Sequence, residues 1–287
     1  LYIIDNESFI EDFLQKISVC KKFSFSIAID HFEVMSNKML GIAFCLSKNE
    51  AYFLPFSKII SEDKNLLRKF QKVFENEEIE KIGHQLKSSI VLLKRYGISV
   101  KGNLFDTSIA HYLLQPELKH QQDYLAEIFL NYHCIAFDSL FDEKLKEKSL
   151  ASLPYGKYAD YLAEKACVDF YLYDALKDKI KEENLDYLCY DVEMPLIYVL
   201  ADMEFTGVSI DTEALKNIAF DLHEKLSIIE KEIYRLAEEE FNINSPKKVG
   251  EILFDKLQIP AKVKKTKTNK QYSTSEDLLQ SIKDKHP

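Results

Sequence analysis

Lysines and hydroxyl-bearing residues gather near the C-terminal end of this sequence, and these residue types suit contact with a polyanion. Residues 261–272 read AKVKKTKTNKQY and contain five lysines and no acid. The span from Asn242 to Pro287 has ten lysines and five acids, a local charge of +5, whereas the rest of the chain carries −14. A basic end on an acidic body favours local contact with a polyanion, and a solvated loop is the other interpretation of such a run.

Motifs for other kinds of chemistry are missing from the sequence. It contains no GxGxxG, Walker or GxSxG pattern, so nucleotide-cofactor enzymes and serine hydrolases have no support. The seven histidines form no HxxxH or HExxH motif, and the five cysteines form no CxxC pair. Neither a zinc site nor a disulfide framework is therefore favoured, and we expect a reducing, cytoplasmic location.

The composition is that of a globular protein. With 287 residues, the chain has room for one large domain or two ordinary ones, and 46% hydrophobic residues suffice for a sizeable core. No apolar run reaches the length of a membrane helix, and the first residues lack the features of a secretory signal. We therefore expect no membrane partner. Because the sequence begins with Leu1 and not with Met, we also expect it to be part of something longer.

Residue periodicity predicts strands and helices in the first 180 or so positions. Period-two alternation indicates strands, and apolar residues at spacings of three and four indicate helices. The expected strands are 23–29, 39–46, 51–56 and 80–83, and the expected helices are 63–74, 86–96, 105–114, 122–131 and 157–183. The first three strands are close enough for an antiparallel meander. Asp106 or Thr107 is the expected N-cap of the helix over 105–114.

After Asp186 the strand signal nearly vanishes. Residues 212–239 carry an apolar seam formed by Leu215, Ile218, Leu222, Leu226, Ile229, Ile233 and Leu236. This seam predicts a long helix that packs against a partner along its length. Pro246 suits the first turn of a further helix over 246–256, with Asn244 or Ser245 as its cap. The change from mixed strands and helices to helices alone predicts a domain boundary near 184–192. The predicted domains are therefore 1–185 and 186–287.

Several segments resemble bacterial DNA polymerases of family A, the DNA polymerase I type. Residues 190–211, 239–260 and 264–280 resemble the stretch that leads into the polymerase and forms its thumb. Ahead of them, KFSFSIAID (22–30), EKIGHQLKSSIVLLKRYGI (80–98), LFDTSIAHYLLQP (104–116) and YLAEKACVDFYLYDAL (161–176) resemble the 3′-5′ exonuclease domain of the same polymerases. Together these resemblances span nearly the whole chain.

The resemblance implies an α/β ribonuclease-H-like exonuclease domain followed by an all-α thumb segment. It implies a fragment of a DNA-directed DNA polymerase, a nucleotidyltransferase of replication and repair, without the 5′ nuclease, palm carboxylates and fingers. The implied partners are duplex DNA and the remaining palm and fingers. The parent enzyme would use Mg²⁺ and would be cytoplasmic and associated with the nucleoid, whereas we expect no cofactor in the fragment.

The proofreading motifs of this family supply acids for two divalent ions, and this sequence lacks those acids. The first motif, Asp-x-Glu, falls on Ser26 and Ala28, and the second falls on Gln85 and Ser89 in place of Asn and Asp. The third, Tyr-x-x-x-Asp, reads Tyr161 and Lys165. Because Mg²⁺ needs oxygen ligands, mostly carboxylates, we expect no catalytic metal and no exonuclease activity.

Two other interpretations compete with the inactive one. An active metal-dependent proofreading exonuclease would need at least three converging acids, and the motif neighbourhoods offer only Asp30 and Asp106. Asp106 is more simply a helix cap and Asp30 a turn residue, while Tyr161 is expected to pack on its helix face and His84 to be a polar surface or cleft residue. An interaction module without a nucleic-acid role is the third interpretation, and the lysine-rich motifs oppose it.

The resemblance to a thumb assigns DNA-backbone contacts to two short segments. Lysines, hydroxyls and amides can bind phosphates and position DNA without reading its sequence. The candidate DNA-binding residues are Asn244, Ser245, Lys247, Lys248, Lys264, Lys265, Thr266, Lys267, Thr268, Tyr272 and Ser273. Ordinary capping with solvated lysines is the alternative for the first segment.

Overall fold

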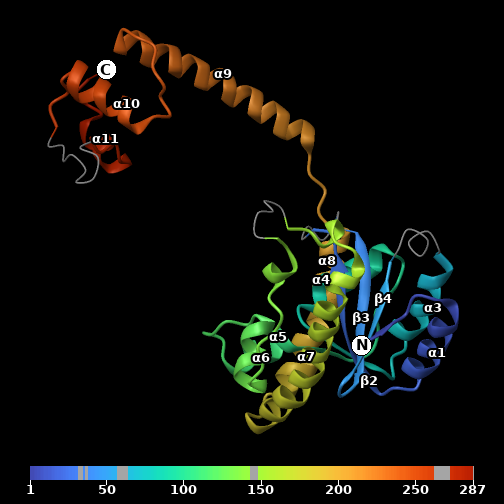
Figure 1. Ribbon diagram of the computed structural model, residues 1–287. Helices are drawn as coiled ribbons and strands as arrows, with labels where there is room; N and C mark the ends of the chain where they lie inside the picture. The colour runs from blue at the N-terminus through green and yellow to red at the C-terminus, as the bar shows by residue number, and fades with distance from the viewer. Residues whose placement is uncertain (32–34, 36–37, 57–63, 143–147, 262–271, 287) are drawn as a thin grey trace. The chain divides into compact units, whose positions relative to one another are not determined.

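The computed structural model describes residues 1–31, 35, 38–56, 64–142, 148–261 and 272–286 (Figure 1). The chain divides into two compact units, Leu1–Gly207 and Val208–Pro287. We call them unit 1 and unit 2 and describe each by itself.

Unit 1 is built on a six-stranded mixed sheet with the order β1-β4-β3-β2-β5-β6. The strands are β1 (Tyr2–Ile3), β2 (Lys22–Ile29), β3 (Met39–Ser47), β4 (Glu50–Pro55), β5 (Glu80–Gly83) and β6 (Leu104–Asp106). The predicted meander is confirmed, because β2, β3 and β4 pair antiparallel in sequence order. β5 and β6 then extend the sheet by parallel pairing beside β2.

Helices cover the sheet of unit 1. They are α1 (Glu7–Ser18), α3 (Lys64–Phe74), α4 (Leu86–Arg95), α5 (Thr107–Leu114), α6 (Gln122–Leu130), α7 (Tyr155–Glu182) and α8 (Met194–Thr206), with short turns at Phe137–Leu140 (η1), Leu150–Ser152 (η2) and Leu188–Glu193 (η3). The long helix α7 packs across β2, β3 and β4. Figure 1 shows α1 and α3 together on the other side of these strands.

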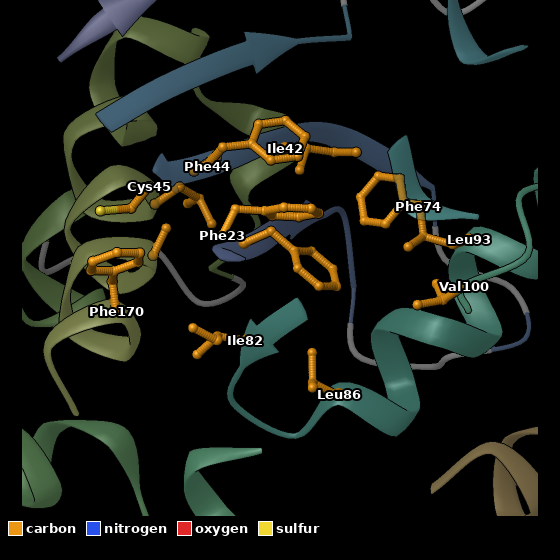
Figure 2. Packing of buried hydrophobic residues seen from close by; sticks show 14 of the residues in the cluster. Phe23, Ile42, Phe44, Cys45, Phe74, Ile82, Leu86, Leu93, Val100 and Phe170 are labelled. Atoms are coloured by element: carbon orange, nitrogen blue, oxygen red, sulfur yellow. The ribbon is translucent and has the colours of Figure 1, made fainter. Parts of the chain in front are cut away.

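Alternation along β2 and β3 decides which side chains face which helix layer. Phe23 and Phe44 pack against Phe74 of α3, with ring centroids 5.8 and 6.2 Å apart (Figure 2). Ser24, between two phenylalanines of β2, instead donates a hydrogen bond from Oγ to the Ala166 carbonyl of α7 at 2.5 Å. On β2 and β3, large aromatic side chains therefore fill the side that faces α3, and the small Ser24 lets α7 approach β2 closely, whereas Phe53 of β4 packs against Tyr158 of α7.

Local signals missed three short or terminal elements. We predicted a helix from residue 105, but Leu104–Asp106 is a fully buried strand that pairs with β5. A three-residue strand has too few positions for a period to show. The predicted N-cap is confirmed, because the Asp106 carboxylate accepts hydrogen bonds from Ser108 N and Ile109 N. β1 and α1, which precede the first predicted strand, were not predicted.

Within the described residues of unit 2, the regular elements are helices joined by turns and coil. Unit 2 contains α9 (Thr212–Ala237), α10 (Pro246–Gly250), a π-helical turn at Glu251–Lys256 (η4) and α11 (Glu276–Ile282). The predicted long helix is confirmed, and Asp211 caps it by accepting a hydrogen bond from Ala214 N. Five seam residues, namely Leu215, Ile218, Leu222, Leu226 and Ile229, are between 53 and 63% exposed. Packing of this seam against a partner therefore stays a prediction.

The compact units do not divide at the domain boundary that the sequence predicted. We predicted domains 1–185 and 186–287, whereas the units divide after Gly207. The helix α8 accounts for the difference, because Ile197 and Ala201 belong to the core of unit 1. Tyr198 also donates a hydrogen bond from its hydroxyl to the Gly102 carbonyl at 2.9 Å. Across the described residues, no helix is both long and apolar enough to cross a membrane.

Candidate functional site

The six exonuclease motif positions lie on three neighbouring parts of unit 1. Ser26, half-buried, and Ala28, fully buried, lie on β2. Gln85 and Ser89 lie at the start of α4, directly after β5, the parallel neighbour of β2. Tyr161 and Lys165 lie one turn apart on α7, which packs against both β2 and β5. The motif positions therefore belong to one packed region of the fold.

Lys165 is held in place by groups from α6. Its Nζ donates hydrogen bonds to Gln122 Oε1 at 3.0 Å and Asp123 Oδ1 at 3.4 Å. Gln122 in turn donates from Nε2 to the Lys165 carbonyl at 2.9 Å. Burial opposes the charge of Lys165, but Tyr161 and Asp123 outweigh it and raise the pKa of Lys165. An ammonium group fixed by two side chains therefore stands at the position that we predicted from the third motif, and its replacement of an acid stays a prediction.

Tyr161 is buried and packs as predicted. Its ring centroid lies 6.0 Å from that of Phe137, and the Lys165 Nζ lies 5.0 Å from the Tyr161 ring centroid. Burial raises the pKa of the Tyr161 hydroxyl. These contacts give the ring a packing role between α7 and the turn at η1.

A chain of buried polar groups runs beside Lys165. His84 Nδ1 lies 2.9 Å from Thr107 Oγ1, and Thr107 donates from Oγ1 to Asp169 Oδ1 at 3.0 Å. Burial raises the pKa of Asp169 to about 7. Burial, followed by the charge of Lys165, lowers the pKa of His84 to about 4. His84 is therefore neutral near pH 7, and sequence reasoning missed Asp169, whose only signal was an acid within an otherwise apolar helix face.

The two surviving acids near the motifs have structural roles, as predicted. The Asp106 carboxylate accepts hydrogen bonds from Leu86 N at 2.7 Å, Ser108 N at 2.9 Å and Ile109 N at 3.2 Å. Asp30 accepts a hydrogen bond from Lys38 N at 2.6 Å. Within the described ranges, no group of three or more His, Cys, Asp or Glu side chains is placed to hold a metal ion.

The first predicted DNA-binding segment lies at the start of α10. Ser245 is its N-cap and accepts a hydrogen bond at Oγ from Lys248 N, so Ser245 rather than Asn244 is the cap. Lys247 and Lys248 are both exposed. Their Nζ atoms lie 3.9 and 2.8 Å from the carboxylate of Glu251. Sequence reasoning missed this partial charge compensation, although the i,i+3 and i,i+4 spacing of these residues could have revealed it.

The second predicted segment is only partly described. Lys264, Lys265, Thr266, Lys267 and Thr268 lie outside the described residues, so their role stays a prediction. Tyr272 packs its ring 5.1 Å from that of Phe254 and donates a hydrogen bond from its hydroxyl to Asp255. Ser273 lies beside Ser275, with 3.5 Å between the two Oγ atoms. Both residues have partners within unit 2.

Comparison with known proteins agrees with this architecture. Residues 1–181 match the family described as 3′-5′ exonuclease, and residues 212–287 match the family described as DNA polymerase family A. The chain is 31% identical to DNA polymerase I of Borreliella burgdorferi over 96% of this chain and 30% of that protein. It is 34% identical to DNA polymerase I of Geobacillus stearothermophilus over 86% of this chain and 27% of that protein.

A solved structure shares the fold. It is the POL domain of Pol1 from M. smegmatis in complex with DNA primer-template and dNTP. The TM-score is 0.70 at 20% identity, and the match covers 99% of this chain and 46% of that one. The chain thus spans about 30% of the length of its curated relatives. It belongs to the bacterial DNA polymerase I family, with a 3′-5′ exonuclease-type domain followed by a segment of the family A polymerase domain.

Proposed function

We propose that the exonuclease-type domain is catalytically inactive and serves as a scaffold for a DNA polymerase. The observation that carries this proposal is the ammonium group of Lys165, which Gln122 and Asp123 hold at the position of an acidic metal ligand. The relatives' printed name, DNA polymerase I, supports DNA synthesis by the whole protein, and we propose replication and repair as its setting. That protein would use Mg²⁺ in its palm and fingers and would work on DNA in the cytoplasm, near the nucleoid.

The residues at the motif positions do not fit a pair of divalent ions. Two-metal hydrolysis places ions ~4 Å apart and needs carboxylates to neutralise them. Ser26, Ala28 and Ser89 bring no charge, and Lys165 brings a charge of the wrong sign. A Mg²⁺ about 4 Å from an ammonium group is opposed by roughly 8 kcal/mol at an effective dielectric constant of about 20. That repulsion exceeds what hydroxyl ligands could recover.

A nuclease assay tests the inactive scaffold. We expect the chain to leave the 3′ end of a labelled single-stranded DNA intact in Mg²⁺ or Mn²⁺, because the proposal gives the domain no site for these ions. The rate of digestion should equal the background rate measured with a chelator. Degradation products resolved on a gel over time provide the measurement. Metal-dependent digestion that disappears in the Tyr161→Phe variant would show an active site in this domain and overturn the proposal. Digestion that survives this change would come from another source.

We further propose that unit 2 binds duplex DNA through its phosphates, without sequence preference. Lys247 and Lys248 are exposed on neighbouring positions of one helix and share a single acid, Glu251. The pair therefore keeps a surplus of positive charge for a phosphate partner. The structural neighbour, a polymerase domain in complex with DNA primer-template, supports the same partner.

The salt dependence of binding tests this contact. Each lysine that no longer neutralises a phosphate should make the slope of log K against log salt shallower by about 0.9. We therefore expect the double variant Lys247→Ala, Lys248→Ala to reduce the slope by up to about 1.8, measured by fluorescence anisotropy with a labelled duplex. Lys216→Ala is the matched control, because Lys216 is an exposed lysine of the same unit that pairs with Glu213. An unchanged slope in the double variant would reject the assignment.

A further inference from the structure

Two cysteines of unit 1 approach each other between the sheet and α7. Cys45 lies on β3, and the strand register pairs it directly with Ser24 of β2. Ser24 donates a hydrogen bond from Oγ to the Ala166 carbonyl at 2.5 Å, which brings Cys45 beside the next residue, Cys167. Figure 2 shows the Cys45 sulfur directed toward α7, near Phe170. The strand pairing and one short hydrogen bond therefore place Cys45 next to the segment of α7 that carries Cys167.

A second contact holds α7 over the same part of the sheet. Tyr171, one turn after Cys167, donates a hydrogen bond from its hydroxyl to Asn49 Oδ1 at 2.8 Å. The same hydroxyl accepts a hydrogen bond from Asn49 N at 3.1 Å. Asn49 lies in the turn that joins β3 to β4. Two contacts therefore hold α7 near Cys45, one from Ser24 to Ala166 and one between Asn49 and Tyr171. Little movement of α7 along β3 is then possible without breaking these bonds.

The two thiols differ in ionisation and in access. Cys45 is fully buried and donates a hydrogen bond from Sγ to the Ser47 carbonyl at 3.2 Å. Its interaction with the neighbouring Cys167 thiol, followed by burial, raises the pKa of Cys45, and the same interaction lowers the pKa of Cys167, which is only partly buried. Thiolates are the nucleophiles in disulfide exchange. Cys167 is therefore the thiol that reacts first with a reagent from solvent, and Cys45 is the thiol that follows.

We propose that Cys45 and Cys167 form an oxidisable pair that closes to an intramolecular disulfide between β3 and α7. The oxidant is a small-molecule disulfide. The Cys167 thiolate attacks one of its sulfurs and expels the other half as a thiolate. Cys45 then loses its proton and attacks Cys167 Sγ, which releases the second half. Two protein thiols are oxidised, and the two electrons reduce one reagent disulfide to two thiols.

The closed pair would cross-link the sheet to the helix that carries Tyr161 and Lys165. It would close a loop of more than roughly 100 residues, and long loops gain most from such a link in the chain-entropy account. A rise in Tm of roughly 5–15 °C is expected for a chain of this size. All five cysteines are free thiols in the structure, and the proposal joins only Cys45 and Cys167, so one internal link is expected.

Oxidation of the native chain with oxidised glutathione tests the pair. We expect a mass loss of about 2 Da for the internal disulfide, a Cys45–Cys167 peptide on mapping without reductant, and a raised Tm that dithiothreitol reverses. Cys167→Ser should abolish all three changes. Cys20→Ser, which removes another partly buried thiol, should leave all three intact, and circular dichroism checks that both variants fold. A glutathione adduct that persists on Cys167, unreacted thiols at both Cys45 and Cys167, or a link from Cys167 to Cys134 would each overturn the proposal.

Discussion

Restoring acids at the four substituted ligand positions is expected to give the chain a Mg²⁺-dependent 3′-5′ exonuclease activity. The variant combines Ser26→Asp, Ala28→Glu, Ser89→Asp and Lys165→Asp. We expect the rate of 3′-end digestion to rise by roughly 10³-fold or more over the unaltered chain, because two metal ions can then activate water and stabilise the leaving oxygen. Digestion of a labelled single strand, with and without a chelator, measures the gain.

Two controls separate metal binding from a general effect of mutation. Lys165→Met removes the ammonium group without adding a ligand and should leave the chain inactive. Mg²⁺ should raise the Tm of the fourfold variant but not that of the unaltered chain, because a ligand stabilises the folded state to which it binds. A folded fourfold variant that neither gains Tm with Mg²⁺ nor digests DNA would show that these positions do not form the ligand set.

The contacts of Lys165 predict a further property of the fourfold variant. Lys165→Asp removes the hydrogen bonds to Gln122 and Asp123 and places a second carboxylate near the latter. Like charges at this range repel, so the variant should be less stable than the unaltered chain when a chelator is present. In the unaltered chain, Gln122 and Asp123 of α6 hold the positive charge of Lys165 in this region.

A large loss of stability from a single polar substitution is expected at Asp106. Asp106→Ala should lower the free energy of unfolding by about 3–5 kcal/mol, because it removes a helix cap and leaves buried N–H groups without an acceptor. The groups that lose their acceptor are Leu86 N, Ser108 N and Ile109 N, which belong to α4 and α5. Urea denaturation followed by circular dichroism measures the change.

Matched variants make the Asp106 result specific. Asp106→Asn keeps one side-chain acceptor and should lose less stability than Asp106→Ala. Asp123→Ala removes an acid whose side chain is 59% exposed and should change the free energy of unfolding by about 1 kcal/mol or less. A loss at Asp106→Ala no larger than that at Asp123→Ala would refute the proposed double role in capping α5 and tying down α4.

Local patterns in the sequence determined most elements of this fold. Alternation predicted β2, β3 and β4, and three-four spacing predicted α7 and α9, because each period is complete within one segment. The strand β6 was not predicted, because three residues are too few to show a period. Only its pairing with β5 defines it as a strand. The division after Gly207 was not predicted. The sequence shows that η3 and α8 are helical, but only their packing against unit 1 shows to which unit they belong.

The sequence by itself also determined which residues stand at the predicted motif positions, namely Ser26, Ala28, Ser89 and Lys165, and their replacement of acids stays a prediction. Tertiary structure alone decided what surrounds them. Gln122 of α6 holds Lys165 of α7, and Thr107 joins His84 to Asp169. Ser24 of β2 pairs with Cys45 of β3 and donates a hydrogen bond to the Ala166 carbonyl of α7. The residues of a motif can be identified from a short stretch of sequence. Contacts between distant segments, in contrast, form only when the sheet and helices pack together.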